Sequence, residues 1–484
     1  MMVRVTEIEL TEARALAESL RKVYTAVAER IGADNAASPL ITKVTGHLGC
    51  PLSDVVVVEE KYRLYEHAAL QVAADLYLDA HSPGAQWFGI VGGERRWESI
   101  INMLLSAMRE GSRMFGRPDY GTAPIGPDAT IEVVQLGLVA TTAPDGSPVV
   151  IGLSNRDDYD AYSLLTVLSA GRQAATAVRG EIDRLMREHD PFRGQVLSFG
   201  FSEHRDNELL TFLPRPELGA EEVILPEGRL EAIEDHIVGI AELAGRLTAA
   251  GQHLRRGLLL YGPPGTGKTH TTRYLIGRLR DHTAVLMTGP AMRKIDYAVA
   301  MARKLAPSIV VVEDVDLIAE DRSQYETSPL LFSLLDAMDG ISGDVDVTFV
   351  LTTNRVEALE KALVQRPGRV DLAVEIPPPD AAARERLILL YARNQPIVAD
   401  VAKVVAATEG VTASFIKELL RRVILVALRS DEPALTDGHF DTALQAMAGD
   451  NQALTRALLG SQETGTVTGP KDERAPARLQ PPSC

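Results

Sequence analysis

Residues 262–269, Gly-Pro-Pro-Gly-Thr-Gly-Lys-Thr, have the types and spacing of a loop that binds phosphate groups. Glycine lets the backbone approach an anion closely, and the main-chain N–H groups at the start of a helix favour negative charge. In such a loop the ammonium of Lys268 reaches the outer phosphates and the hydroxyl of Thr269 ligates Mg²⁺. We therefore predict a nucleoside triphosphate site, whose contacts are Gly262, Pro263, Pro264, Gly265, Thr266, Gly267, Lys268, Thr269 and His270.

A second group of candidate residues follows the apolar run 308–312, which ends in Glu313 and Asp314. Carboxylates at the carboxyl end of a strand lie beside the phosphate loop in a parallel sheet. One of them should hold Mg²⁺, and the next should orient the water that attacks the nucleotide. An acidic strand end alone is also consistent with simple solvation, but behind a phosphate loop it predicts hydrolysis.

Alternating strands and helices are needed to position these residues. Short apolar runs predict strands at 258–261, 284–287, 308–312, 347–353 and 374–376, and helical patterns lie between them, with another at 229–247. Strands that are apolar throughout are typical of a parallel sheet covered on both faces. We therefore expect a three-layer α/β domain at residues 223–378.

The flanking regions have different patterns. Residues 1–200 predict an α+β domain with helices at 10–31, 62–78, 97–109 and 160–188, and strands at 55–58, 87–93, 130–141 and 148–153. The turn at 144–146 should close a hairpin. Residues 201–222 are expected to be a linker. Residues 379–450 predict a helical domain with helices at 380–394, 398–408, 412–429 and 436–448, and residues 451–484 a disordered tail.

Composition narrows the classes of function. The 50 basic and 66 acidic residues give a net charge of −16, which does not favour indiscriminate binding of nucleic acid. Two cysteines, Cys50 and Cys484, exclude a disulfide framework and a cysteine-rich zinc site. The sequence has no run of about 18 apolar residues, so we expect no membrane span. These features fit a cytoplasmic protein.

Residues 223–450 resemble the AAA branch of the AAA+ ATPases, over just under half of the chain. The matching segments are 262–269, Glu313-Asp314, Thr352-Thr353-Asn354-Arg355 and Arg366-Pro367-Gly368-Arg369-Val370-Asp371. The resemblance implies a P-loop NTPase domain that uses ATP and Mg²⁺, a helical lid at 379–450, and a ring homo-oligomer, usually a hexamer. Residues 1–200 lie outside it.

The resemblance also assigns roles by position. Glu313 takes the magnesium role and Asp314 the role of activating water. Asn354 matches the sensor residue that places this water near the γ-phosphate. Arg366 and Arg369 match the arginine fingers, which complete the site of the neighbouring subunit. Residues 409–414 correspond to the lid turn that approaches the adenine, without the arginine that the AAA branch usually has at this helix start.

Three departures from the family pattern keep alternatives open. The acidic pair is Glu-Asp where most members have Asp-Glu, as in the branch that includes the mitochondrial Rieske-protein translocase, and slow hydrolysis is one consequence. Residues 289–307 are short and lack the aromatic–apolar–glycine pore loop; residues 292–295 and Tyr297 either face the pore or lie on a helix surface. There is no His-Glu-x-x-His, hence no attached zinc protease.

We therefore expect an ATP-hydrolysing machine that remodels proteins, in which residues 1–200 recruit a client or adaptor. The Glu-Asp pair and the short pore segment favour an alternative, a nucleotide-gated scaffold that hydrolyses ATP poorly. A nucleic-acid motor is a third reading, and the acidic balance argues against it. Trp87 and Phe88 could anchor a partner, but burial in the core is the simpler role. His67 and His81 have no partner at metal-ligand spacing.

Overall fold

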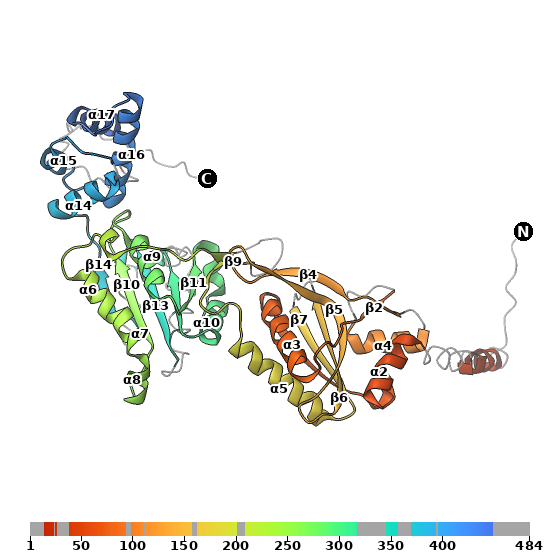
Figure 1. Ribbon diagram of the computed structural model, residues 1–484. Coiled ribbons are helices and arrows are strands. Elements are labelled where there is room, and N and C mark those ends of the chain that lie inside the picture. The colour runs from red at the N-terminus through yellow and green to blue at the C-terminus, as the bar shows by residue number, and fades with distance from the viewer. Residues whose placement is uncertain are drawn as a thin grey trace, which may run out of the picture. The chain divides into compact units, whose positions relative to one another are not determined.

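The computed structural model describes residues 14–23, 25–26, 38–92, 98–110, 113–156, 162–200, 209–316, 334, 336, 338, 345–356, 369–393 and 395–448. The chain divides into two compact units. The first comprises Met1–Leu218, Glu231–Leu260 and Thr271–Val374, and the second comprises Gly219–Leu230, Tyr261–His270 and Glu375–Cys484. Figure 1 gives the element labels. The predicted tail at 451–484 lies outside the described residues, and so does Arg366.

An antiparallel sheet forms the centre of the N-terminal region. Its strands are β1 (Val56–Arg63), β4 (Asp119–Pro124), β5 (Thr130–Thr142), β6 (Pro148–Arg156) and β7 (Tyr162–Ser169), in the order β1-β7-β6-β5-β4. The hairpin predicted at 144–146 is confirmed. The N–H of Ala143 donates to the carbonyl of Ser147 at 2.8 Å, and Gly146 takes the left-handed conformation (φ 84°) that the turn requires. A small second sheet pairs β2 (Gly89–Val91) with β3 (Met114–Gly116).

Helices build a separate apolar core on each side of this sheet. One core includes residues of α3 (His67–His81) and α5 (Arg172–Glu188), and the other includes residues of α2 (Pro39–Leu48) and α4 (Ile100–Glu110). Phe88 is buried in the second core and Trp87 packs against the first, so both have the core role. His67 is buried as well, and its Nε2 lies 2.9 Å from the carbonyl oxygen of Val134.

The helix predicted at 160–188 is wrong in its first half. Residues Tyr162–Ser169 form β7, and the helix α5 begins only at Arg172. Strand β7 lies between β1 and β6 in the middle of the sheet, and all of its residues after Tyr162 are buried. A strand that is buried on both faces loses the alternation of apolar and polar residues, so periodicity could not distinguish it from a buried helix.

A seven-stranded sheet organises the rest of the first unit, in the order β14-β10-β13-β12-β11-β8-β9. The strands are β8 (Val196–Gly200), β9 (Leu209–Leu213), β10 (Arg256–Tyr261), β11 (Thr283–Met287), β12 (Ser308–Val312), β13 (Val347–Thr353) and β14 (Leu372–Glu375). Strand β12 is parallel to both β11 and β13, and every residue of β12 and β13 is buried. Burial on both faces explains the continuous apolar runs in the sequence.

Two sequence-based predictions are wrong in this region: the wholly parallel sheet and the linker at 201–222. The sheet is mixed rather than wholly parallel, because β8 is parallel to β11 while β9 is antiparallel to β8. The predicted linker at 201–222 contains β9, and the predicted boundary at residue 200 cuts through the sheet. Only residues 201–208 separate the two strands, a connection too short for the crossover that a parallel neighbour needs.

Helices pack around this sheet, and further helices come after it in the chain. They are α6 (Arg229–Glu234), the π-helix η4 (Asp235–Gly239), α7 (Ile240–Glu242), α8 (Ala244–Ala249), α9 (Lys268–Arg278), the 3₁₀ helix η5 (Gly289–Lys294) and α10 (Ile295–Lys304). In the second unit, α14 (Ala381–Ala392), α15 (Val401–Ala407), α16 (Ala413–Arg429) and α17 (Asp437–Ala448) share one apolar core. Asp380 and Thr412 cap α14 and α16 through their side-chain oxygens.

Candidate active site

The phosphate loop joins the end of β10 to the start of α9. Gly262, Gly265 and Gly267 have φ angles of 142°, 77° and 118°, a region that strains any residue with a side chain. At Gly262 space is also restricted, since a Cβ there would lie 2.3 Å from the carbonyl oxygen of Ile376. Glycine is therefore required at Gly262 for both conformation and packing.

Positive charge is held within this loop. The Nζ of Lys268 donates to the carbonyls of Gly262, at 2.7 Å, and Pro263, at 2.9 Å, and the Thr266 hydroxyl donates to Pro263 at 2.9 Å. Thr269 is exposed on the first turn of α9. A buried ammonium, glycines with positive φ and the N-terminus of an eleven-residue helix fit a triphosphate, and the exposed hydroxyl fits its magnesium ion.

His270, predicted to contact the nucleotide, has a different partner for its ring. Its Nε2 lies 3.1 Å from the carbonyl oxygen of Glu222. The carboxylate of Glu222 accepts from the main-chain N–H of Gly219 at 3.1 Å and pairs with Arg393 at 3.4 Å. The His270 ring thus contacts the segment before α6, and its contact with the nucleotide stays a prediction.

The turn at 409–414 contacts the phosphate loop within the second unit. The N–H of Ser414 donates to the carbonyl of Gly265 at 3.0 Å. A Cβ at Gly265 would lie 3.0 Å from the Ser414 hydroxyl oxygen and 3.1 Å from that of Thr412. The start of α16 therefore packs directly on the loop.

The acidic residues at the end of β12 meet the polar end of β13. The Nδ2 of Asn354 donates to the Oδ1 of Asp314 at 3.1 Å, and the N–H of Asp314 donates to the hydroxyl of Thr352 at 3.0 Å. Asp314 itself has a φ of 52°, which aspartate tolerates better than most residues. The Glu313 carboxylate lies 3.5 Å from the Thr272 hydroxyl of α9. The structure thus brings together the predicted water-activating and sensor side chains.

Asp316 is a site residue to which the sequence assigned no role. It is buried, and its Oδ1 accepts from the Thr353 hydroxyl at 2.9 Å and from the N–H of Asn354 at 3.1 Å. Asn354 is thereby held through its main chain by one carboxylate and through its side chain by another. The only sequence signal was the third acidic residue in the run Glu-Asp-Val-Asp.

Of the two predicted arginine fingers, only Arg369 lies in the described part of the chain. Its side chain is buried, and NH2 lies 3.7 Å from the Oδ1 of Asp336. Its main chain packs against β10, where a Cβ at Gly257 would lie 2.1 Å from the Arg369 carbonyl. Arg369 thus packs inside its own chain, and its role as an arginine finger stays a prediction. Arg366 keeps its role as a prediction.

The residues considered for the pore differ in exposure, and Arg293 is exposed. Met292 and Ile295 are each 3% exposed and belong to the core around η5 and α10. Tyr297 is half-buried, and the guanidinium carbon of Arg63 lies 4.2 Å from the centre of its ring. The ring of Tyr297 is thus a packing partner of Arg63, and a pore role for it stays a prediction.

A buried charge cluster lies at the opposite ends of the strands. Arg256 begins β10, and its NH1 donates to the Oδ1 of Asp346 at 2.7 Å, while the Nε2 of His282 lies 3.5 Å from Oδ2. Burial raises the pKa of Asp346, but the contacts with His282 and Arg256 outweigh it and leave the pKa below its ordinary value. This cluster ties the starts of β10, β11 and β13 together.

The described residues contain no group of three or more histidine, cysteine or acidic side chains placed to hold a metal ion. Within the same part of the chain, no helix has the length and apolar character needed to cross a membrane.

Comparison with known proteins identifies the region around the phosphate loop. Residues 258–378 match the ATPase family associated with various cellular activities (AAA). The chain is 31% identical over 266 residues to the ATP-dependent zinc metalloprotease FtsH 2 of Symbiobacterium thermophilum, covering 51% of this chain and 44% of that protein. It is 29% identical over 211 residues to the proteasome-activating nucleotidase of Methanosphaerula palustris, covering 40% and 51%.

The chain thus spans about half the length of these curated relatives, and the matches leave much of it uncovered. Enzymes of this family hydrolyse ATP with Mg²⁺. The matched segment contains the phosphate loop, the acidic end of β12 and the sensor position at the end of β13. This protein therefore carries an ATPase domain of the AAA family at residues 258–378.

Proposed function

We propose that this protein is an ATP-hydrolysing ring ATPase that remodels or disassembles protein substrates in the cytoplasm. Residues 1–200 would recruit the client or adaptor, and six copies of the chain would form the ring. The observation that carries the proposal is the hydrogen bond between Asp314 and Asn354, which pairs a base with a sensor at the edge of the sheet. The relatives support an ATPase that acts on proteins.

Each side chain has a distinct task in this proposal. Lys268 and the loop N–H groups bind the phosphates. Thr269 and Glu313 would hold Mg²⁺, which would supply positive charge beside the phosphates. Asp314 accepts the proton of the attacking water, and the amide of Asn354 fixes the direction of attack. Arg366 of an adjacent copy stabilises the charge of the transition state, which links turnover to assembly.

The first experiment measures ATP turnover of the full chain together with its mass by light scattering, with and without ATP. We expect turnover that rises with assembly. Asp314→Asn should bind ATP with turnover reduced at least about 10²-fold, and Arg366→Ala should keep binding but lose turnover. Lys268→Ala should lose binding or its coupling to turnover.

Matched controls separate chemistry from charge removal. Asp296→Asn and Arg429→Ala change exposed residues on α10 and α16 and should behave as the parent protein. Normal hydrolysis by Asp314→Asn would show that the two acidic roles are reversed. Turnover that does not depend on assembly would remove the role of Arg366.

A second candidate is a nucleotide-gated scaffold that hydrolyses ATP slowly. Two observations favour it: the Glu-Asp order of the acidic pair, and the burial of Met292 and Ile295 where a threading machine needs exposed pore residues. Assembly on ATP with turnover near background, unchanged by any protein from the host lysate, would select this function.

A further inference from the structure

Residues 214–218, here called the connector, are attached to the end of α9 by one arginine. The guanidinium of Arg215 donates to the carbonyl of Ile276, and to those of Leu279 at 3.1 Å, Gly194 at 2.9 Å and His282 at 2.8 Å. Helix α9 ends at Arg278, so Ile276 lies in its last turn and Leu279 directly follows it, where the Leu279 carbonyl also accepts from the N–H of His282 at 3.1 Å. A guanidinium suits this position because the end of a helix carries partial negative charge.

Gly277 gives independent evidence that the connector belongs on α9. A Cβ at Gly277 would lie 2.6 Å from the carbonyl oxygen of Pro216, a main-chain atom that cannot rotate away. Glycine inside a helix is destabilising by about 0.5–1 kcal/mol relative to alanine. Its φ is not in the left-handed region, so conformation does not require it. The close contact with the connector therefore requires a residue without a side chain at this position.

A second arginine attaches the preceding segment to α10. The NH1 of Arg193 donates to the carbonyl of Ala306 at 2.6 Å, and NH2 donates to those of Lys304 at 3.2 Å and Arg187 at 2.8 Å. Lys304 ends α10, and Arg187 lies in the last turn of α5. The segment that leaves α5 is therefore held at the ends of α10 and α9 in turn, by Arg193 and Arg215.

We propose that the connector couples the N-terminal region to nucleotide binding through α9. The helix begins at Lys268 and Thr269 and ends under Arg215, a length of about 16 Å at 1.5 Å per residue. A short helix moves as one body, so a shift of the connector changes the position of the phosphate-binding end. The coupling must also act in reverse, because linkage between two sites is reciprocal. This inference rests on the nucleotide binding proposed above.

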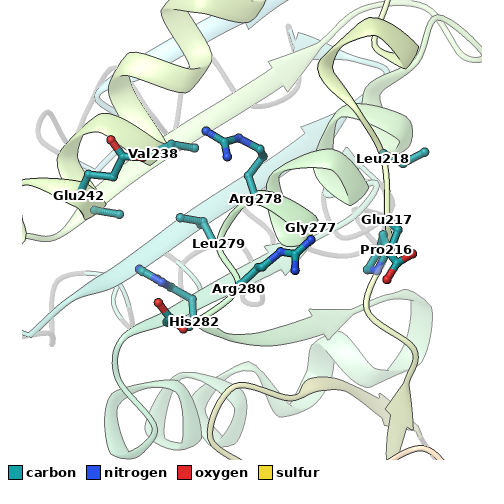
Figure 2. A pocket seen from close by; sticks show the side chains of 12 residues that line it. Pro216, Glu217, Leu218, Val238, Glu242, Gly277, Arg278, Leu279, Arg280 and His282 are labelled. Atoms are coloured by element: carbon teal, nitrogen blue, oxygen red, sulfur yellow. The ribbon is translucent and has the colours of Figure 1, made fainter.

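A cavity of about 430 Å³ borders the connector and is lined by Pro216, Glu217 and Leu218. Figure 2 shows Pro216 and Leu218 of the connector at the right, Arg278 and Arg280 in the middle, and Val238 and Glu242 at the left. Arg280 is exposed and lines this cavity, and burial together with the charge of Arg280 lowers the pKa of Arg215. Within the described residues no hydrogen bond joins the Arg280 guanidinium to α9, so Arg280→Ala removes the same charge without removing such a bond. It therefore provides a control of equal charge.

The test is hydrogen exchange of residues 209–218 in the full chain, with and without a non-hydrolysable ATP analogue and Mg²⁺. In the parent protein we expect the analogue to slow this exchange at least about fivefold, the lower end of typical coupling. Arg215→Ala should abolish the response and raise the Kd of the analogue about tenfold. Arg215→Lys should fall between, because an ammonium cannot span four carbonyls, and Arg280→Ala should match the parent.

Gly277→Ala provides a second variant in case Arg215→Ala does not fold. Alanine favours the helix itself, so a loss of the response in this variant reports the displaced connector rather than a weaker α9. Analogue that binds while residues 209–218 exchange unchanged would overturn the coupling. The coupling would also be overturned if Arg215→Ala and Gly277→Ala both kept the exchange response and the Kd of the parent protein. Failure of the parent chain to bind the analogue would instead contradict the proposed ATPase function.

Discussion

Replacement of Asp316 by alanine should slow ATP hydrolysis without weakening ATP binding. The carboxylate holds the turn at the end of β13 through the Thr353 hydroxyl and the N–H of Asn354, at 2.9 and 3.1 Å. Hydrogen bonds to a charged group contribute about 1.5–3 kcal/mol each, so the two restrain this turn by about 3–6 kcal/mol. A factor of ten corresponds to about 1.4 kcal/mol, so the loss is large enough to release Asn354 from its working position.

The effect on turnover has an upper limit, because Asp316 acts only through Asn354. Removing one oriented polar group from an active site costs about 10²–10³-fold in kcat. We therefore expect Asp316→Ala to lower kcat by about 10²-fold and to leave the Kd of an ATP analogue within about twofold of the parent value. The assay is single-turnover hydrolysis, with thermal unfolding as the check on folding.

The double variant gives the sharper result. If Asp316 only positions Asn354, then Asp316→Ala combined with Asn354→Ala should hydrolyse ATP no more slowly than Asn354→Ala alone. A further tenfold loss in the double variant would refute this reasoning and give Asp316 a role of its own. Asp316→Asn keeps an acceptor oxygen without the charge and should lie between the parent and the alanine variant.

Three further predictions concern packing and charge. Asp346→Ala should destabilise the chain by about 3–5 kcal/mol in chemical denaturation, since Arg256, 1% exposed, would stay buried without its partner; a loss below about 1 kcal/mol would contradict this. Burial lowers the pKa of His67 from 6.5 to about 4, although the hydrogen bond with the carbonyl of Val134 acts in the opposite direction. As the pH falls from 6.5 to about 4, this histidine therefore becomes protonated in the unfolded chain before it does so in the folded chain. The free energy of unfolding declines by up to about 3 kcal/mol over this range. His67→Gln should flatten that decline between pH 7 and about pH 5, and an equal slope would exclude His67 as its source. Gly262→Ala should abolish nucleotide binding, measured by calorimetry, because a Cβ would meet the Ile376 carbonyl at 2.3 Å; retained binding would show that the loop can shift.

The elements around the phosphate loop could be predicted because their signals are local. Strands β12 and β13 have the predicted bounds, 308–312 and 347–353, since each is a short apolar run that ends in polar residues. The helices α14, α16 and α17 begin within one residue of their predicted starts, and Asp380 and Thr412 provide the caps. The roles of Asp314 and Asn354 were predicted from the family resemblance, and the hydrogen bond between their side chains is a finding of the structure.

The failures concern contacts between residues distant in sequence. The local pattern of β7 predicts a helix, because the burial of this strand comes from its neighbours β1 and β6. The local pattern around β9 predicts a linker, because Pro214 lies among polar residues. The pairing of β9 with β8 is not evident from that pattern. The contact of the Arg369 main chain with Gly257 likewise joins residues that are distant in sequence. None of these neighbours is visible in a local pattern.

Strands β8 and β9 make the N-terminal region difficult to remove cleanly. A truncation that starts at residue 201 or 223 would strip β8 from β11 and leave the main-chain groups of β11 without their partner strand. Bare strand edges pair with other chains, so such a fragment should aggregate, and a poor yield would say nothing about client binding. The cut that keeps all seven strands falls between the end of α5 at Glu188 and the start of β8 at Val196. Residues 196–213 are therefore part of the same sheet as the matched residues 258–378, although they lie well before them in the chain.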